Sequence, residues 1–215
     1  MNDDAIRQAI LDGAAALGQP LDDTQTDQLL VLLSELSRWG AKVNLTAIRK
    51  PSDMVSVHIL DSLAVRPLLQ GTRIIDVGTG AGFPGLPLAI CEPDRDFELL
   101  DSNGKKIAFV QHIIAKLGLD NARAVKARAE DYAPAEGFDT VIARALAPIP
   151  RIIELAGHLP VGRGMLLALK GKYPAEELEQ AEHLSDVWET SVTEITVPGL
   201  AQHSRHAVCL RRKAG

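Results

Sequence analysis

The feature that most constrains this chain is a glycine-rich turn that directly follows a short apolar stretch. Residues 72–77 read TRIIDV, and residues 78–85 continue as GTGAGFPG. Glycine lets the backbone turn sharply and lets a ligand lie against bare peptide, and proline suits the first turn of a helix. In open α/β sheets, nucleotides bind in the crevice at the carboxyl ends of the strands. The segment therefore predicts a strand, a turn that can hold a nucleotide, and a helix.

The chain after residue 70 alternates short apolar strands with amphipathic helices. Strands are expected at residues 72–77, 97–100, 122–125, 140–143 and 165–169, helices at 105–117, after 149 and around 174–186, and a closing pair of strands at 192–197 and 207–210. This alternation predicts a doubly wound α/β domain, with a mostly parallel sheet and right-handed crossovers, over residues 71–215. Residues 1–70 have a helical period instead, and the second helix is expected to open at a capping box, Thr24–Asp27. They predict an N-terminal helical cap.

Two acidic residues at the ends of neighbouring strands narrow the choice of nucleotide. Asp76 stands two residues before Gly78, where a pyrophosphate gains nothing from a carboxylate but an amino acid's ammonium group or a bridging water does. Asp101 ends the next strand, where a carboxylate can accept both ribose hydroxyls of NAD or of S-adenosylmethionine; a helix N-cap is the other interpretation. Ala129 and Glu130 follow the third strand, at a usual place for contacts to an adenine edge. The pair of acids favours S-adenosylmethionine over NAD.

Composition sets broader limits on the protein. The formal net charge of −5 argues against non-specific coating of nucleic acid, so RNA contacts would come from local patches. Cys91 and Cys209 stand alone, which predicts reduced thiols in a cytoplasmic protein and no metal site. The first residues lack the basic start of a secretory signal, and no apolar run is long enough to span a bilayer. We expect a cytoplasmic monomer without membrane contact.

Several motifs in a fixed order resemble a known family. They are NLT at 44–46, HILDS at 58–62, DVGTGAGFPG at 76–85, LLDS at 99–102 with two lysines at 105–106, FD at 138–139, RA at 144–145 and KG at 170–171. Together they resemble the glucose-inhibited division protein B family, the bacterial small-subunit ribosomal RNA methyltransferases G. The resemblance covers nearly the whole chain, and GAGFPG preceded by NLT and HILDS is far more specific than a glycine turn alone.

The resemblance implies a class I, Rossmann-like methyltransferase sheet of seven strands with its last strand antiparallel. It implies S-adenosylmethionine-dependent methylation of N7 of one guanine of 16S ribosomal RNA, guanine 527 in conventional numbering, on the RNA or on the small ribosomal subunit. The cofactor contacts carried over by position are Gly78, Phe83, Ala129, Glu130 and Arg144, and Asp101 matches the ribose acid. With the residues argued above, the expected cofactor set is Asp76, Gly78, Gly80, Gly82, Phe83, Asp101, Ala129, Glu130 and Arg144.

The chemistry of guanine N7 fits a site without a general base. N7 carries a free lone pair next to O6, so catalysis should depend on aligning the nucleophile with the sulfonium methyl. Donors that hold O6 and phosphates are still needed, and arginine suits both. Arg144 and Arg128 are the expected catalytic residues. The other candidate donors are Lys105, Lys106 and Lys170, and the cations Arg38, Lys42, Arg49, Lys50, Arg205, Arg211 and Arg212 are candidates to flank an RNA groove.

The roles of Phe83 and His58 are left open by the sequence. Phe83 could stack on the cofactor or base, or be a lid packed on the sheet, and His58 is expected to pack against Asp61 and the sheet rather than touch substrate.

Three rival functions remain. A non-enzymatic regulator would be expected to lose Asp76, Asp101 or Arg144. An NAD-dependent oxidoreductase would need GxGxxG spacing. A small-molecule S-adenosylmethionine-dependent methyltransferase is the closest rival, because its cofactor half would be identical.

Overall fold

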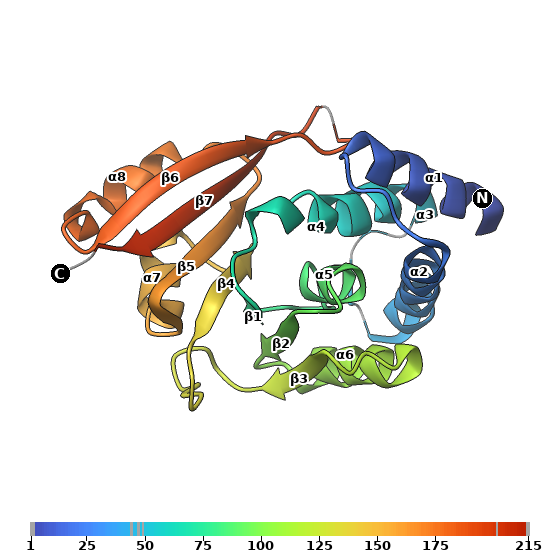
Figure 1. The fold of residues 1–215 in the computed structure, drawn as a ribbon, viewed down its shortest axis with the longest axis horizontal. Coiled ribbons are helices and arrows are strands. Elements are labelled where there is room, and N and C mark those ends of the chain that lie inside the picture. The colour runs from blue at the N-terminus through green and yellow to red at the C-terminus, as the bar shows by residue number, and fades with distance from the viewer. Residues whose placement is uncertain (1–2, 44, 47, 49, 201, 214–215) are drawn as a thin grey trace.

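The structure, a computed structural model, describes residues 3–43, 45–46, 48, 50–200 and 202–213. Within them, seven strands form one sheet in the order β3-β2-β1-β4-β5-β7-β6 (Figure 1). The strands are β1 (Arg73–Val77), β2 (Asp96–Asp101), β3 (Ala122–Lys126), β4 (Phe138–Arg144), β5 (Pro160–Lys170), β6 (Trp188–Ile195) and β7 (Arg205–Arg212). Strands β1 to β5 pair in parallel, and β7 lies antiparallel between β5 and β6. The predicted doubly wound, mostly parallel sheet with an antiparallel last strand is confirmed.

Helices cover both faces of the sheet, and alternate residues of β1 enter different cores. Ile74 faces a core shared with α5 (Gly85–Cys91), α6 (Gly104–Leu117) and the N-terminal helices, whereas Ile75 faces a core shared with α7 (Ile149–Ala156) and α8 (Ala175–Gln180). Because both faces are covered, the central strands are apolar almost throughout, as buried parallel strands usually are.

The N-terminal segment is helical, as predicted. It consists of α1 (Asp3–Ala16), α2 (Asp23–Val43), α3 (Pro51–Met54), a π-helical turn η1 (Val55–Leu60), α4 (Asp61–Leu63) and a 3₁₀ turn η2 (Arg66–Leu68). Buried Ile10 and Leu29 belong to the same core as Ile74 of the sheet. The division into a cap over 1–70 and a domain over 71–215 stays a prediction.

The predicted capping box of α2 is wrong by two residues. The Gln25 N–H donates to Asp22 Oδ1 at 2.7 Å, and Gln25 Oε1 accepts from the Asp22 N–H at 3.2 Å, so the box is Asp22–Gln25. Thr26 is buried, and its hydroxyl donates to the Asp22 carbonyl. The segments Asp22–Gln25 and Thr24–Asp27 overlap and both contain residues suited to capping, so the sequence alone does not separate them. The burial of Thr26 decides for Asp22–Gln25.

Strand and helix ends in the C-terminal third also differ from the prediction. Strand β6 spans Trp188–Ile195 instead of 192–197, because Trp188 anchors its start in the core while most of its residues stay exposed. Such an edge strand has little apolar alternation to read. Helix α8 ends at Gln180 and is followed by a separate 3₁₀ turn η3 (Glu182–Leu184) instead of continuing to residue 186.

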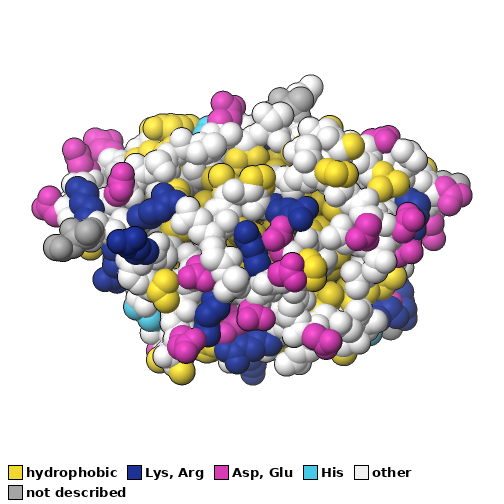
Figure 2. Space-filling model, viewed as in Figure 1, with side chains coloured by type: hydrophobic (Ala, Val, Ile, Leu, Met, Phe, Trp, Pro, Cys, Tyr) yellow, Lys and Arg dark blue, Asp and Glu magenta, His cyan; other side chains and the backbone are white. Residues whose placement is uncertain are grey.

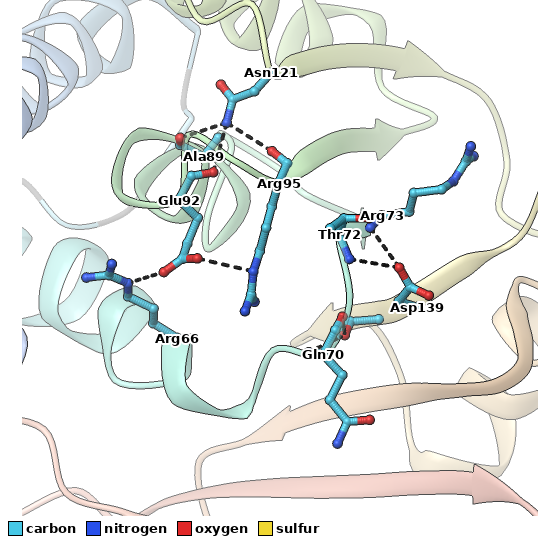
Figure 3. Close-up of polar contacts among 10 residues, drawn as sticks. Arg66, Gln70, Thr72, Arg73, Ala89, Glu92, Arg95, Asn121 and Asp139 are labelled. Carbon is cyan, nitrogen blue, oxygen red and sulfur yellow. Dashed lines mark hydrogen bonds and ion pairs between the residues drawn. The ribbon is translucent and has the colours of Figure 1, made fainter.

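Polar contacts tie together the amino ends of the strands, the edge shown in Figure 3. Asp139 Oδ2 accepts from the Thr72 and Arg73 N–H groups at 2.8 and 2.9 Å, which joins β4 to the start of β1. The Asn121 amide donates to three carbonyl oxygens at and just beyond the end of α5, all within 3.1 Å, and Glu92 pairs with two arginines. Hydrogen bonds and ion pairs therefore hold the amino ends of the strands together.

No helix in the described part of the chain is long and apolar enough to cross a membrane.

Candidate functional site

The glycine loop after β1 has the backbone that only glycine adopts easily. Gly78, Gly80 and Gly82 all have positive φ, at 70°, 61° and 87°. A Cβ at Gly78 would meet Leu146 at 2.7 Å, and one at Gly82 would meet Leu86 at 2.2 Å, whereas at Gly80 the nearest atom is the Gly78 carbonyl oxygen at 3.9 Å. Gly78 and Gly82 are therefore glycines for packing, and Gly80 faces open space where a ligand can approach.

Asp76 lies beneath this loop and holds it in place. Its Oδ2 accepts from the Thr79 hydroxyl at 2.6 Å and from the Gly85 N–H at 2.9 Å. Its Oδ1 is buried and has no hydrogen-bond partner among the described residues. Burial raises the pKa of Asp76 to about 6, although the bonds from Thr79 and Gly85 oppose the rise. A buried carboxylate oxygen without a partner suits a cationic group of a ligand.

Asp101 ends β2 and joins the loop from the other side. Its Oδ2 accepts from the Gly80 N–H at 3.0 Å, and its Oδ1 accepts from the Asn103 N–H at 2.8 Å. The N-cap of α6 is Asn103, whose side chain accepts from the N–H groups of the next two lysines. Asp101 is therefore not the helix cap, and its carboxylate lines a cavity.

That cavity, of about 260 Å³, extends from the glycine loop to the loop after β3. Gly78, Asp101, Ala129 and Glu130 line it together. Arg128 lies in the same cavity wall with its side chain exposed, and no ion pair holds it in the described part of the protein. The size of the cavity, the Asp101 carboxylate in its wall and the nearby Gly80 suit an adenine nucleoside whose tail carries a cationic group toward Asp76. The structure thus brings four of the nine predicted cofactor residues, Gly78, Asp101, Ala129 and Glu130, to one cavity.

Phe83 is a packed residue of the loop. Its ring is 4% exposed and stacks on His58 with a centroid distance of 4.6 Å. His58 Nε2 lies 3.1 Å from the Thr46 hydroxyl oxygen, and its ring packs on Phe83. Burial, with the nearby charge of Arg144, lowers the pKa of His58 to about 4, although the charge of nearby Asp61 acts to raise it, so the ring is neutral near pH 7. The sequence motif that contains Asn44 lies partly outside the described residues.

Arg144 ends β4 and leads to a second cavity at the same edge. Its Nη1 donates to Asp61 Oδ2 at 3.1 Å, and its guanidinium carbon lies 6.0 Å from the centre of the Phe83 ring. Arg205 Nε donates to the other oxygen, Asp61 Oδ1, at 2.7 Å. Next to Arg144, Ala145 has a φ of 51°, a backbone region that costs a non-glycine residue energy and that clusters at functional sites.

The predicted lysine donors separate into free and bound groups. Lys170 Nζ lies 2.7 Å from both the Ala147 carbonyl and Glu177 Oε2, and its side chain is 11% exposed, so it holds the loop after β4. Lys106 lies 3.9 Å from Asp101. Lys105 is exposed on the first turn of α6, with no carboxylate at ion-pair distance in the described part of the chain.

The predicted basic flanks of an RNA groove are not one surface. Arg205 begins β7, whereas Arg211 and Arg212 lie at its far end, where Arg212 packs over Trp188 and donates to the Gly157 carbonyl. Arg38 pairs with Glu35 on α2, and Arg49 and the Lys42 side chain lie outside the described part. On the face in Figure 2, basic side chains gather near the end of β7 and again in the middle, with acidic side chains between them.

Asp61 and Arg205 are site residues that sequence reasoning missed as a unit. Asp61 was noted as part of HILDS and Arg205 as one of many cations, but 144 positions separate them. The available signal was an acidic residue among apolar helical neighbours, which calls for a buried cationic partner.

Comparisons with known proteins agree with this geometry. A family model described as "GidB: rRNA small subunit methyltransferase G" matches residues 25–208. A protein of Idiomarina loihiensis named "Ribosomal RNA small subunit methyltransferase G" is 47% identical over 90% of this chain and 93% of its own length, and one of Nitrosococcus oceani with the same name is 44% identical over 99% of both.

Solved structures support the fold alone. A SAM dependent methyltransferase from Aquifex aeolicus matches with a TM-score of 0.57 and 19% identity, covering 78% of this chain and 96% of that one. A tRNA (uracil-54, C5)-methyltransferase from Pyrococcus abyssi, in complex with S-adenosyl-L-homocysteine, matches with a TM-score of 0.51 and 20% identity, covering 69% and 36%.

Proposed function

We propose, from the premise that this chain belongs to the GidB family of rRNA small subunit methyltransferases G, that it methylates N7 of a specific guanine in 16S ribosomal RNA with S-adenosylmethionine. The structural observation that carries the proposal is the glycine loop at the carboxyl edge of a doubly wound sheet, where Gly80 has free space on its Cα and donates to Asp101 while Asp76 holds the loop from below. The family model and relatives that span most of this chain supply the substrate class.

Residues of the first cavity fit S-adenosylmethionine, which supplies the electrophilic methyl group when bound. Asp101 would accept the ribose hydroxyls, and the loop at Ala129 and Glu130 would meet the adenine. The Oδ1 of Asp76, which has no hydrogen-bond partner in the described part of the chain, fits the ammonium group, because a cation there compensates a buried carboxylate oxygen. Gly80 lets the tail lie against the backbone.

The remaining residues position the acceptor and need not move a proton. Guanine N7 is unprotonated near neutral pH, so no base is required. His58, the imidazole nearest the loop, is buried and stacked on Phe83, which fits a packing role. Arg144 has donors beyond the one given to Asp61, and we assign it the role of orienting guanine O6. Arg128, exposed in the cofactor cavity wall, is proposed to contact RNA phosphate.

RNA contact is proposed for the carboxyl edge and for exposed Lys105 beside it. A net charge of −5 and the mixed charges of Figure 2 suit recognition of one folded region instead of general affinity for RNA. We further propose that the small ribosomal subunit is the partner, that the enzyme acts as a monomer, and that it works in the cytoplasm.

The experiment is a methyl-transfer assay on small subunits and on naked 16S rRNA from a strain lacking the gene, followed by mass spectrometry of the RNA nucleosides. We expect one 7-methylguanosine per RNA, with S-adenosylhomocysteine as the other product. No methylation of either substrate, or methylation at another atom, would overturn the proposal. Turnover on small molecules without RNA would favour the small-molecule methyltransferase.

A further inference from the structure

A second cavity, of about 390 Å³, opens at the carboxyl ends of β4 and β5 beside the first. Ala145 lines this cavity, and the following residue, Leu146, lines the cofactor cavity, so the loop after β4 divides the two. Val57, Val65, Leu169 and Ile195 give it apolar walls, and Asp61, Arg144 and Arg205 give it a charged side. An apolar slot with a few fixed polar groups is the form of a small-molecule or base pocket.

The charged side of this pocket presents a donor directly beside an acceptor. Arg144 Nη1 and Asp61 Oδ2 are 3.1 Å apart, and the Asp61 side chain is 11% exposed. A carboxylate can accept about four hydrogen bonds, and the two arginines supply one to each of its oxygens. Arg144 likewise retains donors beyond those given to Asp61 and to the Val57 carbonyl. Both groups can therefore bind a ligand without losing each other.

We infer that this second cavity receives the target guanine, with Arg144 donating to O6 and Asp61 accepting from N1–H and the 2-amino group. The inference rests on the proposed function, and it adds a base pocket and a specificity residue to it. Guanine presents an acceptor, O6, next to a donor, N1–H, which is the complement of the Arg144–Asp61 pair. Adenine presents the reverse order, a donor next to an acceptor, and would set its amino group against the Arg144 donor and its N1 acceptor against the Asp61 carboxylate.

The order of groups along the guanine edge also matches the order of residues in space. Along guanine the sequence is N1–H, O6 and N7, with N7 next to O6. In the protein, Arg144 lies between Asp61 and Phe83 of the glycine loop. With N1–H at Asp61 and O6 at Arg144, N7 is directed toward the glycine loop. The nucleophilic atom then faces the half of the site that holds the cofactor.

A further group lines the same cavity without an assigned partner. His206 is 9% exposed, and its Nδ1 is buried with no hydrogen-bond partner among the residues that the structure describes. Its ring also packs edge-on against Tyr173, an aromatic side chain that is 58% exposed. The pocket thus has spare hydrogen-bonding capacity, and an exposed aromatic residue contacts one of its wall residues.

The test uses 16S rRNA joined from fragments, with guanosine or inosine at the acceptor position, assembled into small subunits. Inosine keeps N7, O6 and N1–H and lacks only the 2-amino group. We expect inosine to lower the parent kcat/KM about 10- to 100-fold, as loss of a partner for a buried acceptor does. In the Asp61→Asn variant, guanosine should fall to a similar rate, and the preference for guanosine over inosine should largely disappear.

The matched control is Glu35→Gln, another buried acid of the N-terminal helices that pairs with cations but lies outside the cavity. It should lower thermal stability and keep the parent ratio of guanosine to inosine. Asp61→Asn should also keep its affinity for S-adenosylhomocysteine within about twofold, since the cofactor cavity is separate.

The outcomes separate the two proposals. If the parent enzyme does not methylate the guanosine subunits, the proposed function fails. If it methylates guanosine and inosine subunits equally, or if Asp61→Asn keeps the full preference, the base pocket is wrong and the proposed function stands. The parent comparison alone decides the case in which Asp61→Asn does not fold.

Discussion

The two cavities at the carboxyl edge of the sheet are built in different ways. The cavity assigned to the cofactor is lined mainly by residues at and just after the ends of three adjacent strands, β1, β2 and β3, with Leu146, Arg151 and Leu155 completing its wall, and Gly80 of the glycine loop is hydrogen-bonded to its Asp101. The second cavity depends on side chains of Asp61, Arg144 and Arg205, which come from three distant parts of the chain. A nucleotide site can be specified locally, and a base pocket requires the completed fold.

The two cavities also differ in how far their acidic residues are balanced by neighbouring charges. On the cofactor side of the site, Asp76 keeps a buried carboxylate oxygen without a partner among the described residues, so a cationic group of a ligand adds stabilisation there. In the second cavity, Asp61 is already paired with two arginines. This cavity therefore selects a ligand by its pattern of hydrogen-bond donors and acceptors instead of by its net charge. The variants and pH measurements described next would each weaken or sharpen this difference.

The largest effect is expected for Gly80→Val. A Cβ at this position meets no protein atom closer than 3.9 Å, but it occupies the ligand side of the loop and a β-branched residue resists a φ of 61°. Binding of S-adenosylhomocysteine, measured by isothermal titration, should become undetectable while the protein stays folded. Normal binding with a collapsed melting temperature would mean that the turn is only structural.

Gly82→Ala is the control, because its Cβ would meet the Leu86 side chain at 2.2 Å. It should lower the melting temperature more than Gly80→Val does, by the mechanism of overpacking.

Arg144→Ala should leave cofactor affinity near the parent value and slow methyl transfer about 100-fold in single turnovers at saturating RNA, the usual result of misplaced reactants. The fold should survive, because Arg205 still pairs with Asp61. Transfer at the parent rate would show that Arg144 is a structural ion pair.

Lys105→Ala is the companion measurement. Its exposed ammonium should affect only the RNA requirement, with a flatter dependence of binding on salt. An effect on the rate at saturating RNA would instead place it in the base pocket.

Asp101→Ala should weaken binding of S-adenosylhomocysteine by about 1–3 kcal/mol, the cost of losing charge-assisted hydrogen bonds. The variant also frees the Gly80 N–H, which Asp101 accepts at 3.0 Å. Isothermal titration measures the change, and methyl transfer at saturating cofactor should recover. An unchanged affinity would remove Asp101 from the cofactor cavity.

The smallest effect is a pH dependence of cofactor affinity. The pKa of Asp76 is raised to about 6 by burial, so the free enzyme protonates it below that pH. A cationic ligand favours the ionised carboxylate, so affinity for S-adenosylhomocysteine should fall about tenfold from pH 7 to pH 5. Asp76→Asn should bind weakly at both values, and a parent affinity independent of pH would exclude Asp76 as the ammonium partner.

Folding stability responds to pH in the opposite sense at the two buried groups. Asp76, with a pKa raised from 3.8 to about 6, stabilises the fold less as the pH rises through that range. His58, with a pKa lowered from 6.5 to about 4, stabilises it less as the pH falls through its range. Removing Asp76 should therefore make acid unfolding steeper between pH 4 and 6.

Most of the sheet and half of the site could be predicted from the sequence. The central strands are buried on both faces, so they read as apolar runs, and the glycine turn with Asp76 and Asp101 is a signal contained within 26 residues. The edge strand β6 was misplaced because an exposed strand has no such pattern. The capping box was misplaced because two overlapping four-residue segments, 22–25 and 24–27, both contain residues suited to capping.

What the sequence alone determined is therefore the doubly wound sheet, the glycine loop and its acids, because strand period, positive φ and neighbouring strand ends are local or nearly local properties. Only the tertiary structure decided that Lys170 is used inside the protein, that Arg212 packs over Trp188, and that Asp61 sits between two arginines. The physical reason is that an ion pair depends on which surfaces meet after packing, and contacts between residues 61, 144 and 205 leave no periodic trace in the chain.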